Sequence, residues 1–161
     1  MIIELSDTEY MLCTQIGMMR YTVNRAANIK DVTFVRENRV HIETIGVMAE
    51  MAFCKWANLY CNLDIKIQSQ TPDLIYKGWK CDIKATDRAD GRLIVPVKKK
   101  KGSSDVYILG ITSGQTVEFK GFAIEDDIIN ESRIKDLGYG PTYCMDQNEL
   151  TKFKDDAKQV A

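Results

Sequence analysis

Residues 71–86, TPDLIYKGWKCDIKAT, combine charged side chains with the alternating apolar pattern of a β-hairpin. Gly78 predicts a two-residue turn at the centre, because glycine accepts the positive φ that such turns need. With this turn Asp73 faces Asp82 across the hairpin, and Lys84 follows on the same face because side chains alternate along a strand. Two carboxylates side by side repel each other, and a divalent cation between them would convert that repulsion into binding. Oxygen ligands suit Mg²⁺ or Mn²⁺, so the sequence predicts a metal site beside an ammonium group that could hold water or phosphate.

A further carboxylate, Glu50, lies in VMAEMAF, the apolar centre of a helix predicted for residues 40–60. A buried carboxylate without a partner is costly, so a metal ion or Lys84 is the expected partner of Glu50. Glu43 lies on about the same helix face, but a position near the helix start is favourable for any acid. For His41 a packing or surface role is expected. The alternative for the whole hairpin is a solvated polar face, and a one-residue slip in pairing would separate its charges.

These residues resemble the signature of the PD-(D/E)xK nuclease superfamily: a helix glutamate, then Pro-Asp, then Asp or Glu, any residue, and Lys. The chain has the same order in Glu50, Pro72-Asp73 and Asp82-Ile83-Lys84. The segment GVMAEMAFCKW is similar to the glutamate helix of such proteins, and residues 90–111 are similar to small phage and bacterial members. The resemblance covers roughly residues 40–125, and it departs from the commoner pattern in having Asp82 where most members have glutamate.

The resemblance implies a restriction-endonuclease-like core and a metal-dependent nuclease that hydrolyses phosphodiester bonds in DNA. It implies that Glu50, Asp73, Asp82 and the Ile83 backbone carbonyl bind Mg²⁺ or Mn²⁺, and that Lys84 holds or activates the attacking water. The bound ion would lower the pKa of its water and neutralise developing charge. DNA would need a cationic track, which is predicted at Lys77, Lys80, Arg88, Arg92, Lys98, Lys99 and Lys100. The alternative for the lysine run is an ordinary solubilising loop.

Two other functions stay open. A catalytically silent nucleic-acid-binding or assembly protein with a nuclease-like fold would bind DNA in a salt-dependent way without cleaving it. A structural or partner-binding protein would carry the hairpin charges as a surface cluster. For a nuclease, RNA is an alternative substrate, endonuclease and exonuclease action are both open, and cutting both strands of a duplex would favour a homodimer.

The rest of the chain predicts one α/β (α+β) domain over residues 1–161, with a central mixed sheet flanked by helices. Its core spans about 40–125, and N-terminal and C-terminal helices pack on it. A capping box at Ser6 and Glu9 begins the first helix, whose buried stripe is expected at Leu12, Ile16, Met19 and Val23. Strands are predicted at 72–76, 79–86, 92–97, 105–111 and 117–123, a short helix within 124–132, and an exposed helix at 146–159.

Composition limits the class of protein further. The chain has 161 residues, 45% of them hydrophobic and 28% charged, with a net charge of −1, which argues against a wholly basic nucleic-acid-coating protein. Its five cysteines form no C-x-x-C pair, which argues against a zinc ribbon. The N-terminus does not resemble a signal peptide and no apolar run approaches the ~20 residues of a membrane span. We therefore expect an intracellular protein with no membrane partner, and the resemblance implies the cytoplasm of a bacterium or a phage-infected cell.

Overall fold

The computed structural model describes residues 1–27, 39–65, 71–138 and 140–153. Along the chain the elements are β1 (Ile2–Glu4), α1 (Asp7–Ala26), α2 (Arg39–Ala57), β2 (Leu74–Tyr76), β3 (Trp79–Thr86), β4 (Leu93–Pro96), β5 (Val106–Ser113), β6 (Thr116–Ile124), α3 (Glu125–Ile128), the 3-10 turn η1 (Glu131–Arg133), β7 (Ile134–Asp136) and β8 (Pro141–Met145). They form a five-stranded sheet of order β1-β6-β5-β3-β2 and a three-stranded sheet of order β4-β8-β7. The predicted strands are thus present.

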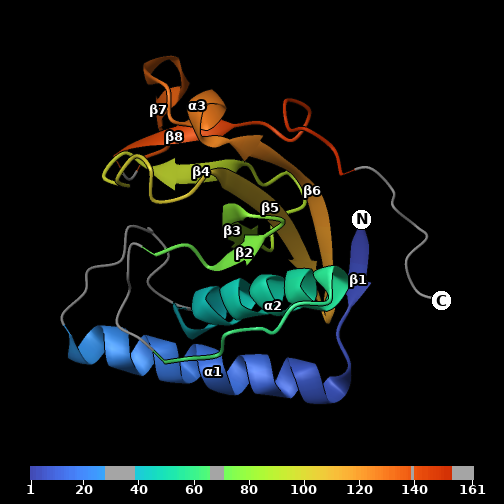
Figure 1. The fold of residues 1–161 in the computed structure, drawn as a ribbon. Coiled ribbons are helices and arrows are strands. Elements are labelled where there is room, and N and C mark those ends of the chain that lie inside the picture. The colour runs from blue at the N-terminus through green and yellow to red at the C-terminus, as the bar shows by residue number, and fades with distance from the viewer. Residues whose placement is uncertain (28–38, 66–70, 139, 154–161) are drawn as a thin grey trace.

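The elements stack in layers (Figure 1). Helix α1 packs on α2, and α2 packs on one face of the five-stranded sheet. A first hydrophobic cluster around Phe53 and Ile108 fills the space between α2 and the sheet. A second cluster around Tyr107, Leu109 and Leu93 joins the opposite face to the three-stranded sheet. The predicted α+β class with a mixed sheet and packed helices is confirmed, whereas the second sheet was not predicted.

Strand β3 has different neighbours along its length. It pairs in parallel with β5 from Cys81 to Thr86, but its antiparallel pairing with β2 ends at Cys81. From Asp82 onward, among the described residues, β3 is therefore hydrogen-bonded to a strand on one side only. This open edge of β3 is the place where the predicted site residues lie.

The first helix begins as predicted but turns a different face inward. The capping box forms, since the Ser6 hydroxyl accepts from the Glu9 N–H and the Glu9 carboxylate accepts from the Ser6 N–H. Ile16 is buried, but Leu12 and Met19 are exposed, so the predicted stripe is wrong in part. The buried positions of the helix are Cys13, Ile16, Gly17 and Asn24. A small residue rather than a large one lies at the centre of the α1–α2 contact.

Gly17 permits this contact, which leads to a prediction about stability. A Cβ atom at Gly17 would lie 2.5 Å from Thr44 Oγ1 and 2.7 Å from the Thr44 backbone, whereas a Cβ at Gly46 would meet nothing within 4 Å. We expect Gly17→Ala to lower the free energy of unfolding by about 1–3 kcal/mol through overpacking. The matched Gly46→Ala should raise it by roughly 0.5–1 kcal/mol through helix propensity. Urea denaturation measures both, and equal effects of the two substitutions would contradict the close helix contact.

The predicted C-terminal helix is absent from its described part. Residues 146–150 form a turn, and Thr151 makes an isolated bridge to Phe122. The Glu149 carboxylate accepts from the Asp146 N–H at 3.0 Å, as in a capping box, yet no helix follows because Leu150 is buried in the second cluster. Residues 154–159 of that prediction lie outside the described residues. The short helix predicted within 124–132 is present as α3.

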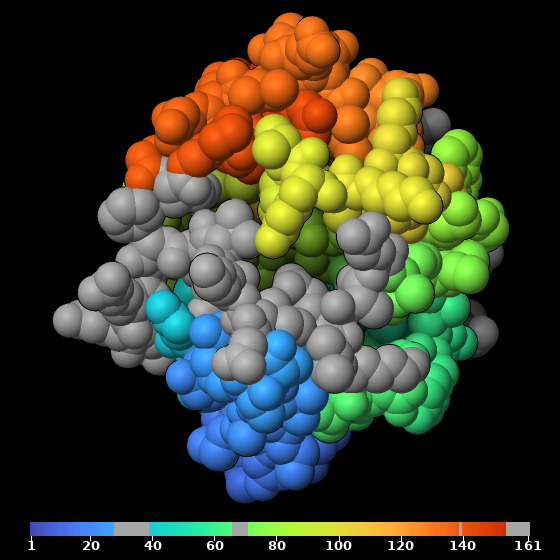
Figure 2. Space-filling model, turned by 90° about the vertical axis from the view of Figure 1, so that its left-hand side faces the viewer, coloured from blue at the N-terminus to red at the C-terminus, as the bar shows by residue number. Residues whose placement is uncertain are grey.

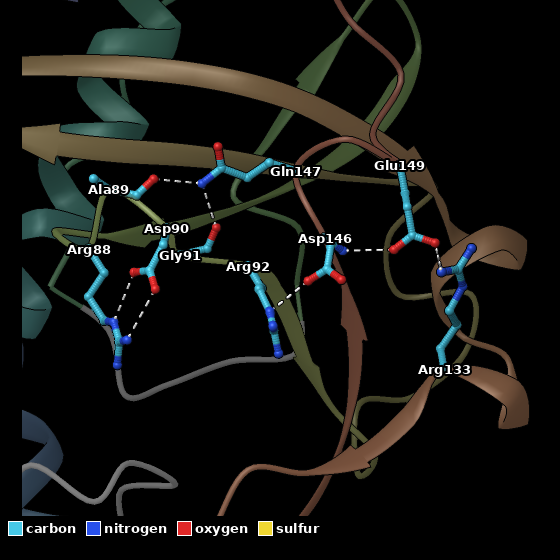
Figure 3. Close-up of polar contacts among 9 residues, drawn as sticks. All are labelled: Arg88, Ala89, Asp90, Gly91, Arg92, Arg133, Asp146, Gln147 and Glu149. Carbon is cyan, nitrogen blue, oxygen red and sulfur yellow. Dashed lines mark hydrogen bonds and ion pairs between the residues drawn. The ribbon is translucent and has the colours of Figure 1, made fainter.

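Figure 3 shows how this turn is held against the β3–β4 connection. The Gln147 amide donates to the backbone carbonyls of Ala89 and Gly91, both at 2.8 Å, and Glu149 pairs with Arg133. The Gln147 contacts tie the turn after β8 to the end of β3, and the Glu149 contact ties it to η1. Within the described residues no helix has the length and apolar character needed to cross a membrane.

Candidate active site

The hairpin forms with the predicted turn and register. Lys77 and Gly78 occupy its loop with φ values of 50° and 85°, as a two-residue turn of the I′ type requires. Tyr76 pairs with Trp79, and Leu74 pairs with Cys81. The turn chemistry of Gly78 therefore fixes which residues reach the open edge of β3.

Asp73 lies one residue before the first ladder pair, at the point where β2 leaves β3. Its N–H donates to the Cys81 carbonyl at 2.9 Å, and its carboxylate accepts from the Ile83 N–H at 2.6 Å. Because Asp73 is outside the ladder, it is not the directly opposed partner of Asp82 that was predicted. The carboxylate instead satisfies the backbone N–H that β2 no longer pairs. The N–H and C=O of one strand residue point to the same side, so the Ile83 carbonyl also faces this edge.

Asp82 is buried, with 2% of its surface exposed. Its Oδ1 forms an ion pair with Lys84 Nζ, and its Oδ2 lies 2.6 Å from Lys99 Nζ. The interpretation as a surface charge cluster is therefore wrong for Asp82. Burial alone would lower the pKa of Lys84, but the charges of Asp82 and Asp73 outweigh it and the net pKa is raised. Lys84 is thus an ammonium donor at neutral pH.

Glu50 has a partner that sequence reasoning missed. Its two carboxylate oxygens accept from Arg20 Nη1 and Nη2 at 2.8 and 2.9 Å, a bidentate geometry that makes strong charge-assisted hydrogen bonds. The protein partner is therefore Arg20 and not the expected Lys84, while a metal ion at Glu50 stays a prediction. Glu50 nevertheless belongs to the same cluster, because its charge raises the pKa of both Asp73 and Lys84. The available signal for Arg20 was its position at helical spacing from the buried Cys13 and Asn24 on α1.

Asp73 carries the clearest sign of crowded negative charge. Desolvation by the surrounding protein raises the pKa of Asp73 to about 7, and the charges of Asp82 and Glu50 add to the rise. The residue is nonetheless exposed on its outer side. Water therefore screens part of the interaction, and the energetic cost of the charged form is well below that of an acid without solvent contact. The edge therefore combines closely spaced acids with access from solution.

The residues fit a hard divalent cation in donor chemistry but are not arranged as a finished coordination shell. Within the described ranges, no group of three or more His, Cys, Asp or Glu side chains is placed to hold a metal ion. Asp82 and Glu50 are turned toward Lys84, Lys99 and Arg20. The Asp73 carboxylate and the Ile83 carbonyl share the open edge, and carboxylate and carbonyl oxygens are the ligands that Mg²⁺ and Mn²⁺ prefer. A cation could bind here if a lysine released Asp82.

Three hydroxyl groups make the interior of the site polar. Tyr107 pairs with Asp82 in the β3–β5 register, so both side chains lie on the same face of the sheet. Its hydroxyl, like those of Ser103 and Ser104, is buried without a hydrogen bond of good geometry among the described residues. Desolvation and the Asp82 charge raise the pKa of Tyr107 to about 12. Sequence reasoning did not select any of these three residues.

Because the Tyr107 hydroxyl makes no hydrogen bond of good geometry within the described part of the chain, we expect Tyr107→Phe to change the free energy of unfolding by less than about 1 kcal/mol or to raise it. By contrast, Tyr107→Ala should cost roughly 3–5 kcal/mol, because it leaves a cavity in the second cluster. Thermal and urea denaturation of the two variants measure this difference. A loss for Tyr107→Phe comparable to that for Tyr107→Ala would show that the hydroxyl is bound in solution.

The residues of the predicted DNA track differ in exposure and in ion pairing. Lys77, Lys80, Lys98 and Lys100 are exposed. Arg88 pairs with Asp90 at 3.4 Å and Arg92 with Asp146 at 2.6 Å (Figure 3). Lys99 is turned into the site, with 13% of its side chain exposed and its Nζ on Asp82, so its contact with DNA stays a prediction. The segment around residue 100, yellow in Figure 2, lies on the surface in the upper half of that face, with α1 in blue at the bottom.

Comparison with known proteins found no match: no protein-family model matches the chain, and neither does a curated protein or a solved structure. The function of the chain is therefore inferred from the geometry of its site.

Proposed function

We propose that this chain is a metal-dependent DNA nuclease with a restriction-endonuclease-like core. The observation that carries the proposal is the gathering of Asp73, Asp82, Lys84 and Glu50 at the open edge of β3. These residues come from an irregular segment, a strand and a helix, yet their charges act on one another. Burial and the nearby charges of Asp82 and Glu50 raise the pKa of Asp73, and a cation beside this carboxylate would favour its charged form.

In this proposal Asp73, Asp82 and the Ile83 carbonyl hold Mg²⁺ or Mn²⁺, and Glu50 orients water at its margin. A bound ion supplies a water of lowered pKa and neutralises charge on phosphate oxygens. The Lys84 ammonium stays protonated because its pKa is raised. It therefore acts as a hydrogen-bond donor that positions the attacking water or a phosphate oxygen, not as a general base.

DNA would approach over the face that carries the exposed lysines. Lys98 and Lys100 flank Lys99 on the segment that covers Asp82, and Lys77 lies at the hairpin tip. Lysine contacts to phosphates make binding strongly salt-dependent. This arrangement supports sequence-independent binding of the DNA phosphate backbone close to the acids.

A second candidate function is a catalytically silent nucleic-acid-binding or assembly protein. The observation that favours it is the internal compensation of charge, since both oxygens of Asp82 contact lysines and both oxygens of Glu50 contact Arg20. Such a protein would hold DNA through its lysines without needing a metal ion.

The test is to incubate the purified protein with circular and linear DNA, and with RNA in parallel, in the presence of Mg²⁺ or Mn²⁺, beside the Asp73→Asn variant. Metal-dependent cleavage of DNA by the wild type alone supports the nuclease and locates its site. Salt-dependent DNA binding without cleavage or metal binding supports the second candidate. Cleavage that is unchanged in Asp73→Asn would reject the proposed site.

A further inference from the structure

Lys99 differs from its neighbours in the run Lys98–Lys101. Its Nζ lies 2.6 Å from Asp82 Oδ2, with 13% of the side chain exposed. Lys101 points outward and pairs with Asp126, and 64% of its side chain is exposed. One lysine of this run is therefore part of the candidate site, although the four lysines cannot be distinguished from the sequence.

Hydrogen bonds near both ends of the β4–β5 connection fix the backbone that carries Lys99. The Lys99 N–H donates to the Pro96 carbonyl at 2.9 Å, which forms a turn directly after β4. The Gly102 N–H donates to the Glu125 carboxylate at 2.9 Å, and the Lys80 ammonium donates to the Gly102 carbonyl at 3.3 Å. The backbone is thus tied to α3 and to the start of β3. The lysine side chain has four methylenes, so its ammonium can change position by rotation about their bonds without a change in this backbone.

The charges of the cluster balance without a metal ion. The cluster contains three acids and three bases, namely Asp73, Asp82, Glu50, Lys84, Lys99 and Arg20. When all six are ionised their sum is zero, so a divalent cation entering this edge would leave an excess of two positive charges. Like charges brought together at low exposure are unfavourable. Binding of the ion is therefore favoured if one of the three bases moves away.

Lys99 is the base whose departure disturbs the fold least. Arg20 is held by two hydrogen bonds to Glu50 within the α1–α2 contact. Lys84 lies on β3 itself, where Asp82, Asp73 and Glu50 all stabilise its charge. Lys99 contacts Asp82 from an exposed connection, and after its release Asp82 still has Lys84. We therefore expect Lys99 to be the base that moves away when the cation binds.

Resting on the nuclease function above, we propose that Lys99 is an exchangeable counter-ion of the site. It occupies Asp82 Oδ2 in the metal-free protein and gives up that oxygen when a divalent cation binds. Its released ammonium then faces the exposed surface between Lys98 and Lys100, where it contacts a DNA phosphate. Metal binding and DNA binding are coupled in this way, because the ion frees a cation for the nucleic acid.

The experiment is a calorimetric titration with Mn²⁺ of the wild type, Lys99→Met and Lys101→Met. Lys101→Met is the matched control, because it removes a lysine of the same run that pairs with a different carboxylate. We expect Lys99→Met to bind Mn²⁺ at least about tenfold more tightly than the wild type, since no charge contact has to break first. Lys101→Met should stay within about twofold of the wild type. Lys99→Arg should remain close to the wild type because it keeps the contact, and thermal denaturation in EDTA checks that each variant is folded.

The outcomes separate this inference from the function on which it rests. If wild type and Lys99→Met bind Mn²⁺ equally, or if Lys99→Met binds more weakly, the exchange is overturned while the metal site stands. If Lys99→Met binds Mn²⁺ and the wild type does not, the exchange is supported in its strongest form. If neither protein binds Mn²⁺, the proposed nuclease function fails and the exchange fails with it.

Discussion

Replacing Asp73 with asparagine is expected to lower metal-dependent DNA cleavage by at least about a hundredfold and to leave the protein at least as stable as the wild type. The asparagine side-chain oxygen can still accept the hydrogen bond from the Ile83 N–H, which the Asp73 carboxylate accepts at 2.6 Å. The substitution removes one negative charge from the vicinity of Asp82 and Glu50, whose charges raise the pKa of Asp73. Activity and stability therefore move in opposite directions, which a merely structural residue would not produce.

The pH dependence of stability gives an independent readout of Asp73. An ordinary aspartate has a pKa near 3.8, whereas that of Asp73 in the folded protein is raised to about 7. Between these values the folded state holds a proton that the unfolded state has lost, so this residue's contribution to the free energy of unfolding falls as pH rises from about 4 to about 7. Above that range the contribution is constant. Solvent at the exposed side of Asp73 reduces the size of the effect without changing its sign.

The measurement is urea denaturation of wild type and Asp73→Asn at several pH values from 4 to 8, combined with the cleavage assay. The stability of Asp73→Asn relative to the wild type should increase with pH across this interval. Asp126→Asn is the control, because Asp126 is an exposed acid paired with Lys101 away from the site. A constant difference between Asp73→Asn and the wild type would contradict the raised pKa, and a large loss of stability would show that the charge itself is needed for folding.

Replacing Asp82 with alanine is expected to lower the free energy of unfolding by about 3–5 kcal/mol, because it leaves two ammonium groups at a buried position without their shared carboxylate. Asp82 is 2% exposed, and both Lys84 and Lys99 lie on it. Loss of cleavage in this variant would therefore combine loss of a metal ligand with loss of structure. Asp73→Asn is for that reason the sharper test of catalysis.

A double-mutant cycle measures the coupling directly. Adding Lys99→Met to Asp82→Ala removes one of the two unpaired ammonium groups, and we expect the double variant to recover part of the lost stability. Denaturation by urea at pH 7 provides the four values of the cycle. Additive effects of the two substitutions would mean that Lys99 does not interact with Asp82 in solution.

The parts of the fold that could be predicted from the sequence have local causes. The hairpin register follows from the turn at Gly78, and the start of α1 follows from the capping box at Ser6 and Glu9. The same kind of local signal failed at Asp146 and Glu149. There the capping contact forms, but burial of Leu150 and the bridge at Thr151 keep the chain from forming a helix. A local pattern predicts an element only where tertiary packing does not oppose it.

The residues missed in the site depend on contacts between distant parts of the chain. Arg20 and Glu50 are 30 positions apart and meet because Gly17 brings α1 close to α2. Lys99 is one of four consecutive lysines, and its direction is set by the turn at Pro96 and the tie at Gly102. Spacing in the sequence indicated which acids belong together, but it contained no information about which bases would neutralise them.

The open edge of β3 also has a consequence for how copies of this protein behave beside one another. A strand that pairs on one side only presents free backbone groups, to which a strand of another molecule can add and begin aggregation. Here the Asp73 carboxylate accepts from the Ile83 N–H, and Lys84 places a partly exposed ammonium group on the same strand. A neighbouring strand would have to displace the carboxylate and desolvate these charges. The polar groups that we propose to act on DNA thus also hinder strand addition between two copies of this protein. Substitutions that make this edge apolar should therefore cause self-association.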